Sequence, residues 1–312
     1  MVLANAGWRE LTVIDEASAD SFPVVVCYPT REPEHKRNLG PFPVSAACDA
    51  AVATGDLPLV MLSHGSGSSP LVNRDLALSL ARTGFVVGMP VHPGDNRDDR
   101  RLQGTLRNLQ RRPHHLRLAA DVVLRDPALF PDNTPDGFAL IGHSLGAYTA
   151  LALAGGAPRT LSQPWPDGPA EPIPVAHDPR VSALVLLAPA AVWFHGEGVL
   201  AGVHAPVMML AGEQDTVTPP PHHADLVARQ LPHPARLDYR VVPGAGHFSF
   251  LSVFPPEMRQ PGFPPAQDPP GFDRAAFQQY LVAEITSFLY RTRPTGPQNQ
   301  GVVRSSPAEW PV

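Results

Sequence analysis

The sequence predicts an α/β fold with a mostly parallel central sheet, flanked by helices and preceded by antiparallel strands. Two observations predict this fold class. Short, continuous apolar runs bounded by glycine or proline recur along the chain, with helical patterns between them. Such runs are typical of strands that are buried on both faces, and their alternation with helices is the pattern of parallel βαβ units.

The expected elements follow in chain order. The segments "RELTVID" and "FPVVVCYP" predict an antiparallel hairpin near the N-terminus. Later strands are expected at 57–65, 84–91, 137–144, 181–189, 205–212 and 237–244. Helices are expected at about 71–82, 114–125, 145–155, 221–231 and 273–291. The last of these helices has an apolar stripe that includes Phe277, Leu281 and Ile285.

The length and the proline distribution indicate the domain organisation. A chain of 312 residues is long enough for one large domain or two small ones, and no repeat or long linker divides it. We therefore expect a single domain over 1–292 and a C-terminal tail over 293–312. Many of the 39 prolines fall outside the apolar runs, which predicts stiffened insertions near 157–180 and 255–270.

Composition excludes several classes of function. With a formal net charge of −5, the chain lacks the excess of basic residues that is typical of nucleic-acid-binding proteins. The N-terminus has no leader pattern and no apolar run reaches about 18 residues, so we expect a cytoplasmic protein without a membrane partner. Lys36 is the only lysine, which argues against a P-loop, a Schiff base or a Ser-Lys dyad. The oligomeric state stays open.

The cysteine and histidine spacings predict no metal site and no cofactor. Cys27 and Cys48 form no C-x-x-C motif, although a single disulfide between them stays open. The histidine pairs at 114–115 and 222–223 lack carboxylates at a metal-binding spacing. We interpret these four histidines as solvated or capping residues.

Ser144 lies in the motif Gly142-His143-Ser144-Leu145-Gly146, between an apolar strand pattern and an alanine-rich helix pattern. This context is typical of a nucleophile elbow, in which flanking glycines let a strand and a helix approach closely while the serine projects above the sheet. The alternative interpretation is an ordinary helix N-cap. We predict that Ser144 is a nucleophile.

A nucleophilic serine needs a base and an acid later in the chain. His247 follows the strand pattern at 237–244 on a glycine-rich loop and is the expected base. Asp215 lies just beyond the strand pattern at 205–212 and is the expected acid, since its carboxylate can reach the far nitrogen of the imidazole. Glu213 and Asp238 are the alternative acids.

Two backbone amides are expected to bind the oxyanion. The N–H of Leu145 follows the nucleophile directly and lies at a helix N-terminus, which favours negative charge. The second donor is expected from the glycine-rich loop "LSHGSGSS", where the N–H of Ser66 is the candidate. The alternative for this loop is a phosphate site, which the absence of a nearby lysine disfavours.

From about Gly7 to Tyr290 the chain resembles the α/β-hydrolases, and within them the bacterial predicted dienelactone hydrolase group related to platelet-activating-factor acetylhydrolases. The resemblance rests on "GWRELTVID", "VVVCYPT", "LSHGSGSS", "GFVVGMPVHPGDN", Arg112-Pro113, "IGHSLGAYTALALAG" and "PGAGHFSFL", in that order. It implies a serine esterase with the triad Ser144, Asp215 and His247. Similarity to cutinase-like polyester hydrolases implies oxyanion amides at Leu145 and Ser66.

This elbow carries serine where dienelactone hydrolases carry cysteine, so dienelactone activity is not implied. We expect a serine hydrolase that cleaves small-molecule carboxylic esters through an acyl-enzyme. An acyltransferase or an amidase would use the same triad, and a non-catalytic binding protein on this fold would usually lack one of its members.

Three aromatic residues are candidates for substrate binding. Trp193 and Phe194 follow the strand pattern at 181–189, at the sheet edge where ligands bind in open α/β sheets. Phe248 adjoins His247. The alternative for Trp193 is packing beneath a loop. The segment 255–270 is expected to form a partial lid.

Overall fold

The computed structural model describes residues 5–161 and 169–293. Part of the expected insertion at 157–180, residues 162–168, and the tail from 294 onward lie outside the described residues. The described strands form one sheet in the order β10-β9-β8-β7-β5-β6-β2-β1-β4-β3. Neighbours from β10 to β6 pair in parallel, whereas β6–β2, β2–β1 and β4–β3 are antiparallel.

The strands are β1 (Asn5–Asp15), β2 (Asp20–Thr30), β3 (His35–Leu39), β4 (Phe42–Cys48), β5 (Leu59–Ser63), β6 (Val86–Pro90), β7 (Phe138–His143), β8 (Val181–Leu187), β9 (Val207–Gly212) and β10 (Leu237–Val242). The α-helices are α1 (Arg74–Arg82), α2 (Leu106–Arg125), α3 (Leu145–Leu153), α4 (Ala224–Gln230) and α5 (Arg274–Thr292). The short 3₁₀ helices are η1 (Pro70–Asn73), η2 (Val192–Phe194), η3 (Pro220–His222), η4 (Pro234–Arg236), η5 (Pro256–Met258) and η6 (Pro264–Ala266).

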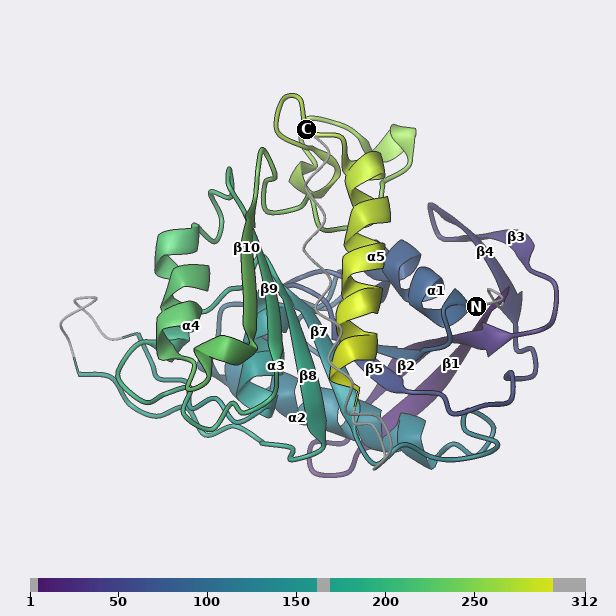
Figure 1. Ribbon diagram of the computed structural model, residues 1–312, viewed down its shortest axis with the longest axis horizontal. Helices are drawn as coiled ribbons and strands as arrows, with labels where there is room; N and C mark the ends of the chain where they lie inside the picture. Colours follow the sequence, from purple (N-terminus) through teal and green to yellow (C-terminus); the bar gives the residue numbers. More distant parts are fainter. Residues whose placement is uncertain (1–4, 162–168, 294–312) are drawn as a thin grey trace.

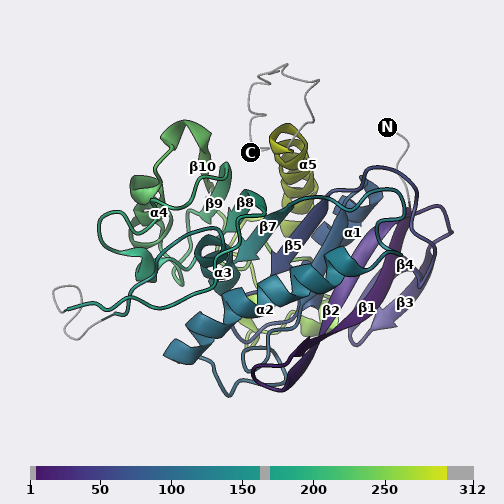
Figure 2. The ribbon, with the colours of Figure 1, turned by 90° about the horizontal axis from the view of Figure 1, so that it is seen from below.

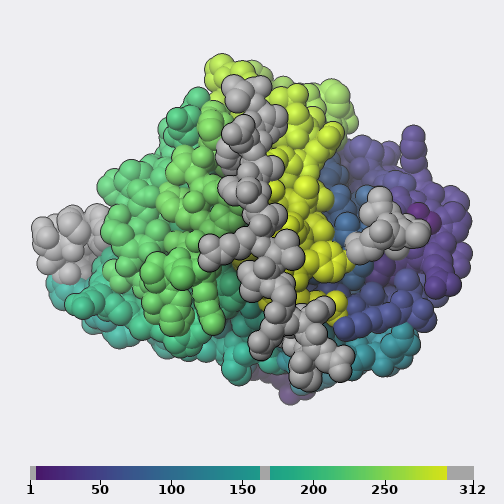
Figure 3. All heavy atoms as spheres, viewed as in Figure 1, coloured from purple at the N-terminus to yellow at the C-terminus, as the bar shows by residue number. Residues whose placement is uncertain are grey.

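Helices cover both faces of the sheet. Figure 1 shows α1 and α5 in front of the strands, and Figure 2 shows α2 and α3 on the opposite side. In the space-filling view, α5 crosses the front face between the green region of α4 and β10 and the purple N-terminal strands (Figure 3). The parallel strands therefore lie inside a three-layer α/β arrangement.

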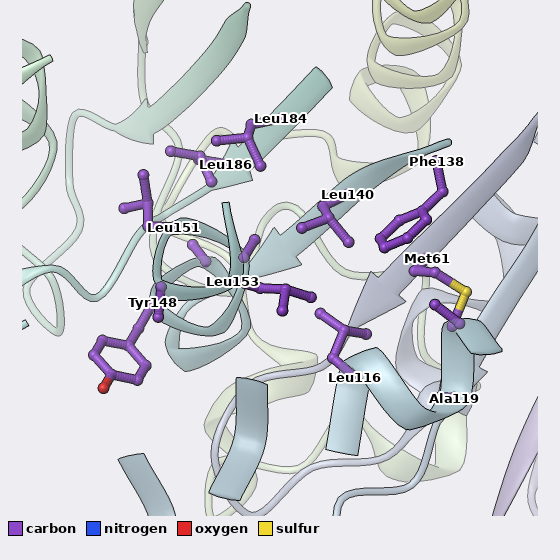
Figure 4. Close-up of a cluster of buried hydrophobic side chains, with 14 of the residues drawn as sticks. Met61, Leu116, Ala119, Phe138, Leu140, Tyr148, Leu151, Leu153, Leu184 and Leu186 are labelled. Atoms are coloured by element: carbon purple, nitrogen blue, oxygen red, sulfur yellow. The ribbon is translucent and has the colours of Figure 1, made fainter. Parts of the chain in front are cut away.

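Alternating side chains of the central strands supply a separate core to each face. Met61 and Leu140 pack with Leu116 of α2 and Tyr148 of α3 (Figure 4). Their neighbours in the sequence point the other way, and Val60, Leu62 and Ile141 pack with α1 and α5. Burial on both faces explains why these strands are continuously apolar.

Two parts of the fold differ from the sequence expectation. The β3–β4 hairpin was not expected, because β3 reads "HKRNL" and is largely exposed, so it carries no apolar pattern. It is held by pairing with β4 at the sheet edge. This hairpin matters for the site, because its second strand begins at Phe42.

Helix α2 begins at Leu106, earlier than the expected start at 114. Thr105 caps it by accepting a hydrogen bond from the N–H of Asn108 at 3.1 Å. Pro113 therefore lies inside the helix and leaves the carbonyl of Leu109 without its helical donor. The hydroxyl of Tyr148 donates to that carbonyl at 3.2 Å, so a side chain of α3 replaces the lost bond.

Cys27 and Cys48 are both free thiols. Trp8 of β1 pairs with Cys27 of β2 on one side and with Cys48 of β4 on the other. The two cysteines are thus separated by two strand spacings, about 9.6 Å, which exceeds the roughly 7 Å limit for a disulfide. Burial raises the pKa of the Cys27 thiol well above its ordinary value.

Candidate active site

Ser144 occupies a sharp turn between β7 and α3. Its backbone has φ 55° and ψ −120°, a conformation that a residue with a side chain rarely adopts. Two hydrogen bonds to neighbouring segments hold the turn: the N–H of Ser144 donates to the carbonyl of Leu187 at 2.9 Å, and its carbonyl accepts from Ala190 at 3.0 Å. This is the geometry of a nucleophile elbow.

The flanking glycines are required by close backbone contacts. A Cβ at Gly142 would lie 2.5 Å from the backbone nitrogen of Ala147 in the first turn of α3. A Cβ at Gly146 would overlap the carbonyl oxygen of Ser63 at the end of β5. The elbow therefore lies against the carboxyl ends of both β5 and β7, where the strand order reverses direction and ligands usually bind.

The structure brings Ser144, His247 and Asp215 together from three separate loops. The Nε2 atom of His247 lies 3.0 Å from the Oγ atom of Ser144. The Nδ1 atom of His247 lies 2.8 Å from Oδ2 of Asp215. Asp215 follows β9 and His247 follows β10, and Gly212 permits the two loops to meet because a Cβ there would lie 2.5 Å from the Ala245 carbonyl oxygen.

Asp215 is buried and stays ionised. Burial raises its pKa, but the hydrogen bond and charge of His247 and the hydrogen bonds from Thr218 outweigh this and lower the pKa to about 2. Oδ1 accepts from the N–H groups of Val217 and Thr218 at 2.8 Å each, and Oδ2 accepts from the Thr218 hydroxyl at 2.8 Å.

The alternative acids lie in other interactions. Glu213 accepts from the N–H of Gly244 at 2.8 Å, and Asp238 pairs with Arg240 at 2.6 Å. Among the described residues, Asp215 is the carboxylate that forms a hydrogen bond with the imidazole of His247.

His143, the residue before Ser144, fixes the loop of His247. Its Nε2 atom lies 2.9 Å from the carbonyl oxygen of His247, and the two rings lie with centroids 5.0 Å apart. Burial, followed by the charge of His247, lowers the pKa of His143 to about 3. His143 is therefore neutral near pH 7 and can donate Nε2–H to this carbonyl.

The loop 64–68 lies beside the elbow. A Cβ on Gly65 would be 3.3 Å from Cβ of Ser144, so the backbone of this loop reaches the nucleophile directly. Within the described part of the chain, the N–H groups of Ser66 and Leu145 donate no hydrogen bond to a protein acceptor. Both amides are thus available to a ligand oxygen, as an oxyanion hole requires.

Asp95 and Arg112 hold this loop from below. Asp95 accepts from the Ser66 hydroxyl and the Gly67 N–H at 2.8 Å each. Its other oxygen forms an ion pair with Nη1 of Arg112 at 2.7 Å. Burial raises the pKa of Asp95, but the charge of Arg112 and the hydrogen bonds it accepts lower it overall.

Arg112 also contacts the helix that follows Ser144. Its Nε donates to Thr149 at 3.0 Å, and Thr149 donates to the carbonyl of Leu145 at 2.9 Å. Nη2 donates to the carbonyl of His64. One buried guanidinium therefore connects the two segments that carry the candidate oxyanion amides.

A cavity of about 560 Å³ opens above Ser144 and His247. One part of its wall is apolar and comes from η1, the start of β4 and the segment 248–265: Phe42, Val72, Phe248, Leu251, Phe254, Met258, Phe263, Pro264 and Pro265. Another part is polar and contains Arg97, Arg100 and Gln103. Figure 1 shows the η5–η6 segment in light green at the upper end of α5.

The structure places the three aromatic candidates differently. Phe248 lines the cavity, and its ring lies edge-on to that of His247 at 4.9 Å. Trp193 and Phe194 do not line it. They pack on Tyr148 with ring centroids at 5.2 Å and 5.4 Å, because η2 folds back over α3 after β8. Trp193 thus packs against the ring of Tyr148, as in the alternative interpretation of this residue.

Two of the histidines interpreted as solvated or capping are buried, and one of them, His223, occupies the N-cap position of α4. His115 is 1% exposed and packs beside Phe22 with ring centroids 5.3 Å apart. His223 accepts from the N–H of Ala191 at 2.9 Å, and burial lowers its pKa to about 4. A neutral histidine can be buried and pack as an aromatic ring does. Its residue type alone therefore does not tell a buried position from an exposed one.

Sequence reasoning also missed Asp95, Thr218 and Arg100. Asp95 lies between Gly94 and Asn96 just after β6, at the edge where active-site loops gather, and that position was a usable signal. Thr218 lies three residues after Asp215, the spacing at which a threonine can cap a turn. Arg100 lies in a charged run and gave no signal.

Comparison with known proteins bears on the fold. No family model matches the chain, and no curated protein matches it in sequence. A ferulic acid esterase from Streptomyces cinnamoneus is similar in structure, with a TM-score of 0.65 and 18% sequence identity over 96% of this chain and 94% of that chain. The predicted fold class is confirmed: the chain has an α/β-hydrolase-like fold.

Neither a membrane span nor a metal-binding cluster occurs among the described residues. None of the helices there is long and apolar enough to cross a membrane. No cluster of three or more histidine, cysteine, aspartate or glutamate side chains in the same residues is arranged to hold a metal ion.

Proposed function

We propose that this protein is a serine hydrolase that cleaves carboxylic esters through an acyl-enzyme. The observation that carries the proposal is the Ser144–His247–Asp215 chain of contacts, at 3.0 Å and 2.8 Å. Hydroxyl, imidazole and carboxylate in this order are the arrangement that makes a serine nucleophilic in neutral water. The structural neighbour is itself an esterase, which is in keeping with the proposal.

The first half-reaction forms the acyl-enzyme. Neutral His247 accepts the Ser144 proton on Nε2 while Oγ attacks the ester carbonyl carbon, and the carbonyl oxygen becomes an oxyanion. The N–H groups of Leu145 and Ser66 stabilise that charge, helped by the N-terminus of α3. When the oxyanion collapses, the C–O bond to the alcohol breaks and His247 returns the proton to the leaving alkoxide oxygen.

The second half-reaction releases the acid. His247 takes a proton from water, the resulting oxygen attacks the acyl carbon, and collapse of the second oxyanion breaks the bond to Oγ, which regains its proton from His247. Asp215 holds the Nδ1–H tautomer throughout and stabilises the imidazolium. Thr218 and the Val217 N–H keep that carboxylate oriented.

The test is active-site labelling followed by a substrate panel. A fluorophosphonate probe should label the wild-type protein on Ser144 and leave Ser144→Ala unlabelled. The wild type should hydrolyse p-nitrophenyl esters, and Ser144→Ala should retain less than about one part in 10³ of that activity. Abundant hydrolysis by the alanine variant would overturn the proposal. Panels of anilides, and of esters with added acceptor alcohols, measure amidase and acyltransferase activity in the same assay.

A further inference from the structure

The charged side chains that line the cavity above Ser144 include two arginines. Its lining includes Arg97 and Arg100 and no aspartate or glutamate among the described residues, although the whole chain has a formal net charge of −5. A cavity wall of one sign attracts ligands of the opposite sign and raises their local concentration. The charge of the cavity is therefore opposite to that of the chain.

The two arginines differ in their partners. Arg97 forms a paired contact with Asp98, with Nε–Oδ1 at 3.1 Å and Nη2–Oδ2 at 3.2 Å. The guanidinium of Arg100 forms no ion pair and donates no hydrogen bond to any residue the structure describes. Arg100 is thus the cavity arginine whose donors are free for a ligand.

Arg100 lies close to the reacting serine along the backbone of one loop. A Cβ on Gly65 would be 3.3 Å from Cβ of Ser144, and a Cβ on Gly67 would be 3.5 Å from Nε of Arg100. Gly65 and Gly67 are two residues apart, which a chain spans in at most about 7 Å. Gln103, whose Nε2 is 3.1 Å from the same Cβ position, adds an amide donor beside the guanidinium.

The remaining wall of the cavity is apolar. The rings of Phe42 and Phe254 lie 5.8 Å apart, and those of Phe254 and Phe263 lie 5.5 Å apart. These rings belong to an apolar cluster that continues to Phe248 beside the imidazole. Such a surface accommodates an alkyl chain or an aromatic ring.

We propose that the site selects esters that carry a carboxylate a few bonds from the scissile carbonyl, bound by Arg100, and an apolar group, bound by the phenylalanine-lined wall. This rests on the proposed ester hydrolysis at Ser144. A planar guanidinium beside an amide donor is suited to a carboxylate, because its N–H groups bind both oxygens.

The kinetic test compares two esters of similar length, mono-p-nitrophenyl adipate and p-nitrophenyl hexanoate. The ratio of their kcat/KM values, anionic over neutral, should fall about fivefold in Arg100→Gln, as expected for one exposed charge pair, and further in Arg100→Glu. Arg101→Gln is the matched control: Arg101 adjoins Arg100, is exposed, and is paired with Asp20 and Asp99 at 3.0 Å each. The ratio in this control should equal the wild-type ratio. An equal ratio in wild type and Arg100→Glu would overturn the inference.

A binding test separates this inference from the proposed reaction. In the Ser144→Ala protein, p-butylbenzoate should bind more tightly than neutral p-butylbenzamide by isothermal titration calorimetry, and Arg100→Gln should remove the difference. Equal affinities for the two probes, or a difference that survives Arg100→Gln, would refute the role of Arg100. Hydrolysis of neither ester, with the binding preference intact, would overturn the proposed function alone.

Discussion

Arg112 and Asp95 form an ion pair in which both side chains are fully buried, with Nη1 and Oδ2 2.7 Å apart. The pair lies beneath the loop that contains Ser66, and the same guanidinium reaches α3 through Thr149. The geometry of the candidate oxyanion hole therefore depends on two side chains that do not line the cavity. Among the described residues, each charge is paired with the other, and polar groups such as those of Asn108 and Thr149 add hydrogen bonds.

Removal of one partner should leave the other charge buried and unpaired. We expect Arg112→Met to lower the free energy of unfolding by about 3–5 kcal/mol, measured by urea denaturation. Adding Asp95→Asn should recover part of this loss, since it removes the stranded charge. Arg97→Met, in an exposed pair, should cost less than about 1 kcal/mol. Strictly additive losses in the double variant would contradict the coupling.

Asp215 should affect kcat by setting which nitrogen of the His247 imidazole carries the proton. Asp215→Asn should lower kcat for p-nitrophenyl acetate by about 10⁴-fold, because the amide favours the wrong proton position on His247. Thr218→Val removes the hydroxyl that donates to Oδ2 of Asp215 and lies 3.0 Å from Nδ1 of His247, and it should lower kcat by roughly tenfold. Glu213→Gln is the control that keeps wild-type kcat. Full activity of Asp215→Asn would exclude this carboxylate as the acid.

Buried histidines should make the fold sensitive to acid. Burial lowers the pKa values of His64 and His143 from 6.5 to about 3. Between these values the unfolded chain binds protons that the folded chain does not, so stability is complete above pH 6.5 and falls as the pH drops towards 3. Each histidine contributes a slope of up to about 1.4 kcal/mol per pH unit.

Urea denaturation at several pH values between 7 and 4 measures this slope, and His64→Gln should reduce it. Asp215 acts in a lower window: its pKa falls from 3.8 to about 2, so its contribution is complete above pH 3.8 and is lost progressively as the pH falls from 3.8 to 2. A denaturation midpoint that stays constant from pH 7 to 4 would disprove the histidine effect.

Two phenylalanines should separate substrate contacts from core packing. Phe263 lines the cavity, so Phe263→Ala should lower kcat/KM for p-nitrophenyl octanoate relative to the acetate. Phe194 is fully buried against Tyr148, so Phe194→Ala should cost about 3–5 kcal/mol of stability and leave the octanoate-to-acetate ratio unchanged. A changed ratio in Phe194→Ala would restore a substrate role for that residue.

The central strands and the order of the triad could be predicted from the sequence for a physical reason. Strands buried on both faces are continuously apolar, so β5, β7 and β8 stand out. Residues at their carboxyl ends meet at one edge, which brought Ser144, Asp215 and His247 into one prediction. The geometry of these three side chains agrees with it, while their catalytic roles, the single-domain organisation and the closer family resemblance stay predictions.

Other parts of the site could not be predicted from the sequence. They depend on contacts between residues that lie far apart along the chain. Nothing in the local pattern around Arg112 indicates that its guanidinium meets Asp95, seventeen positions away along the chain. The hairpin that carries Phe42 has no apolar alternation in β3, because edge strands tolerate polar side chains on both faces. The sequence therefore gives no signal for Phe42 in the cavity wall, and Trp193, one of the candidates for that wall, packs on Tyr148.

The arrangement of the two thiols around β1 makes the molecule convenient for spectroscopy. Cys27 is wholly buried, whereas Cys48 at the end of β4 is partly exposed. A maleimide dye would therefore attach at Cys48 in preference to Cys27. Phe42 begins the same strand six residues earlier, about 20 Å away, so that dye would label β4 without covering the phenylalanine-lined wall, and no engineered cysteine is needed.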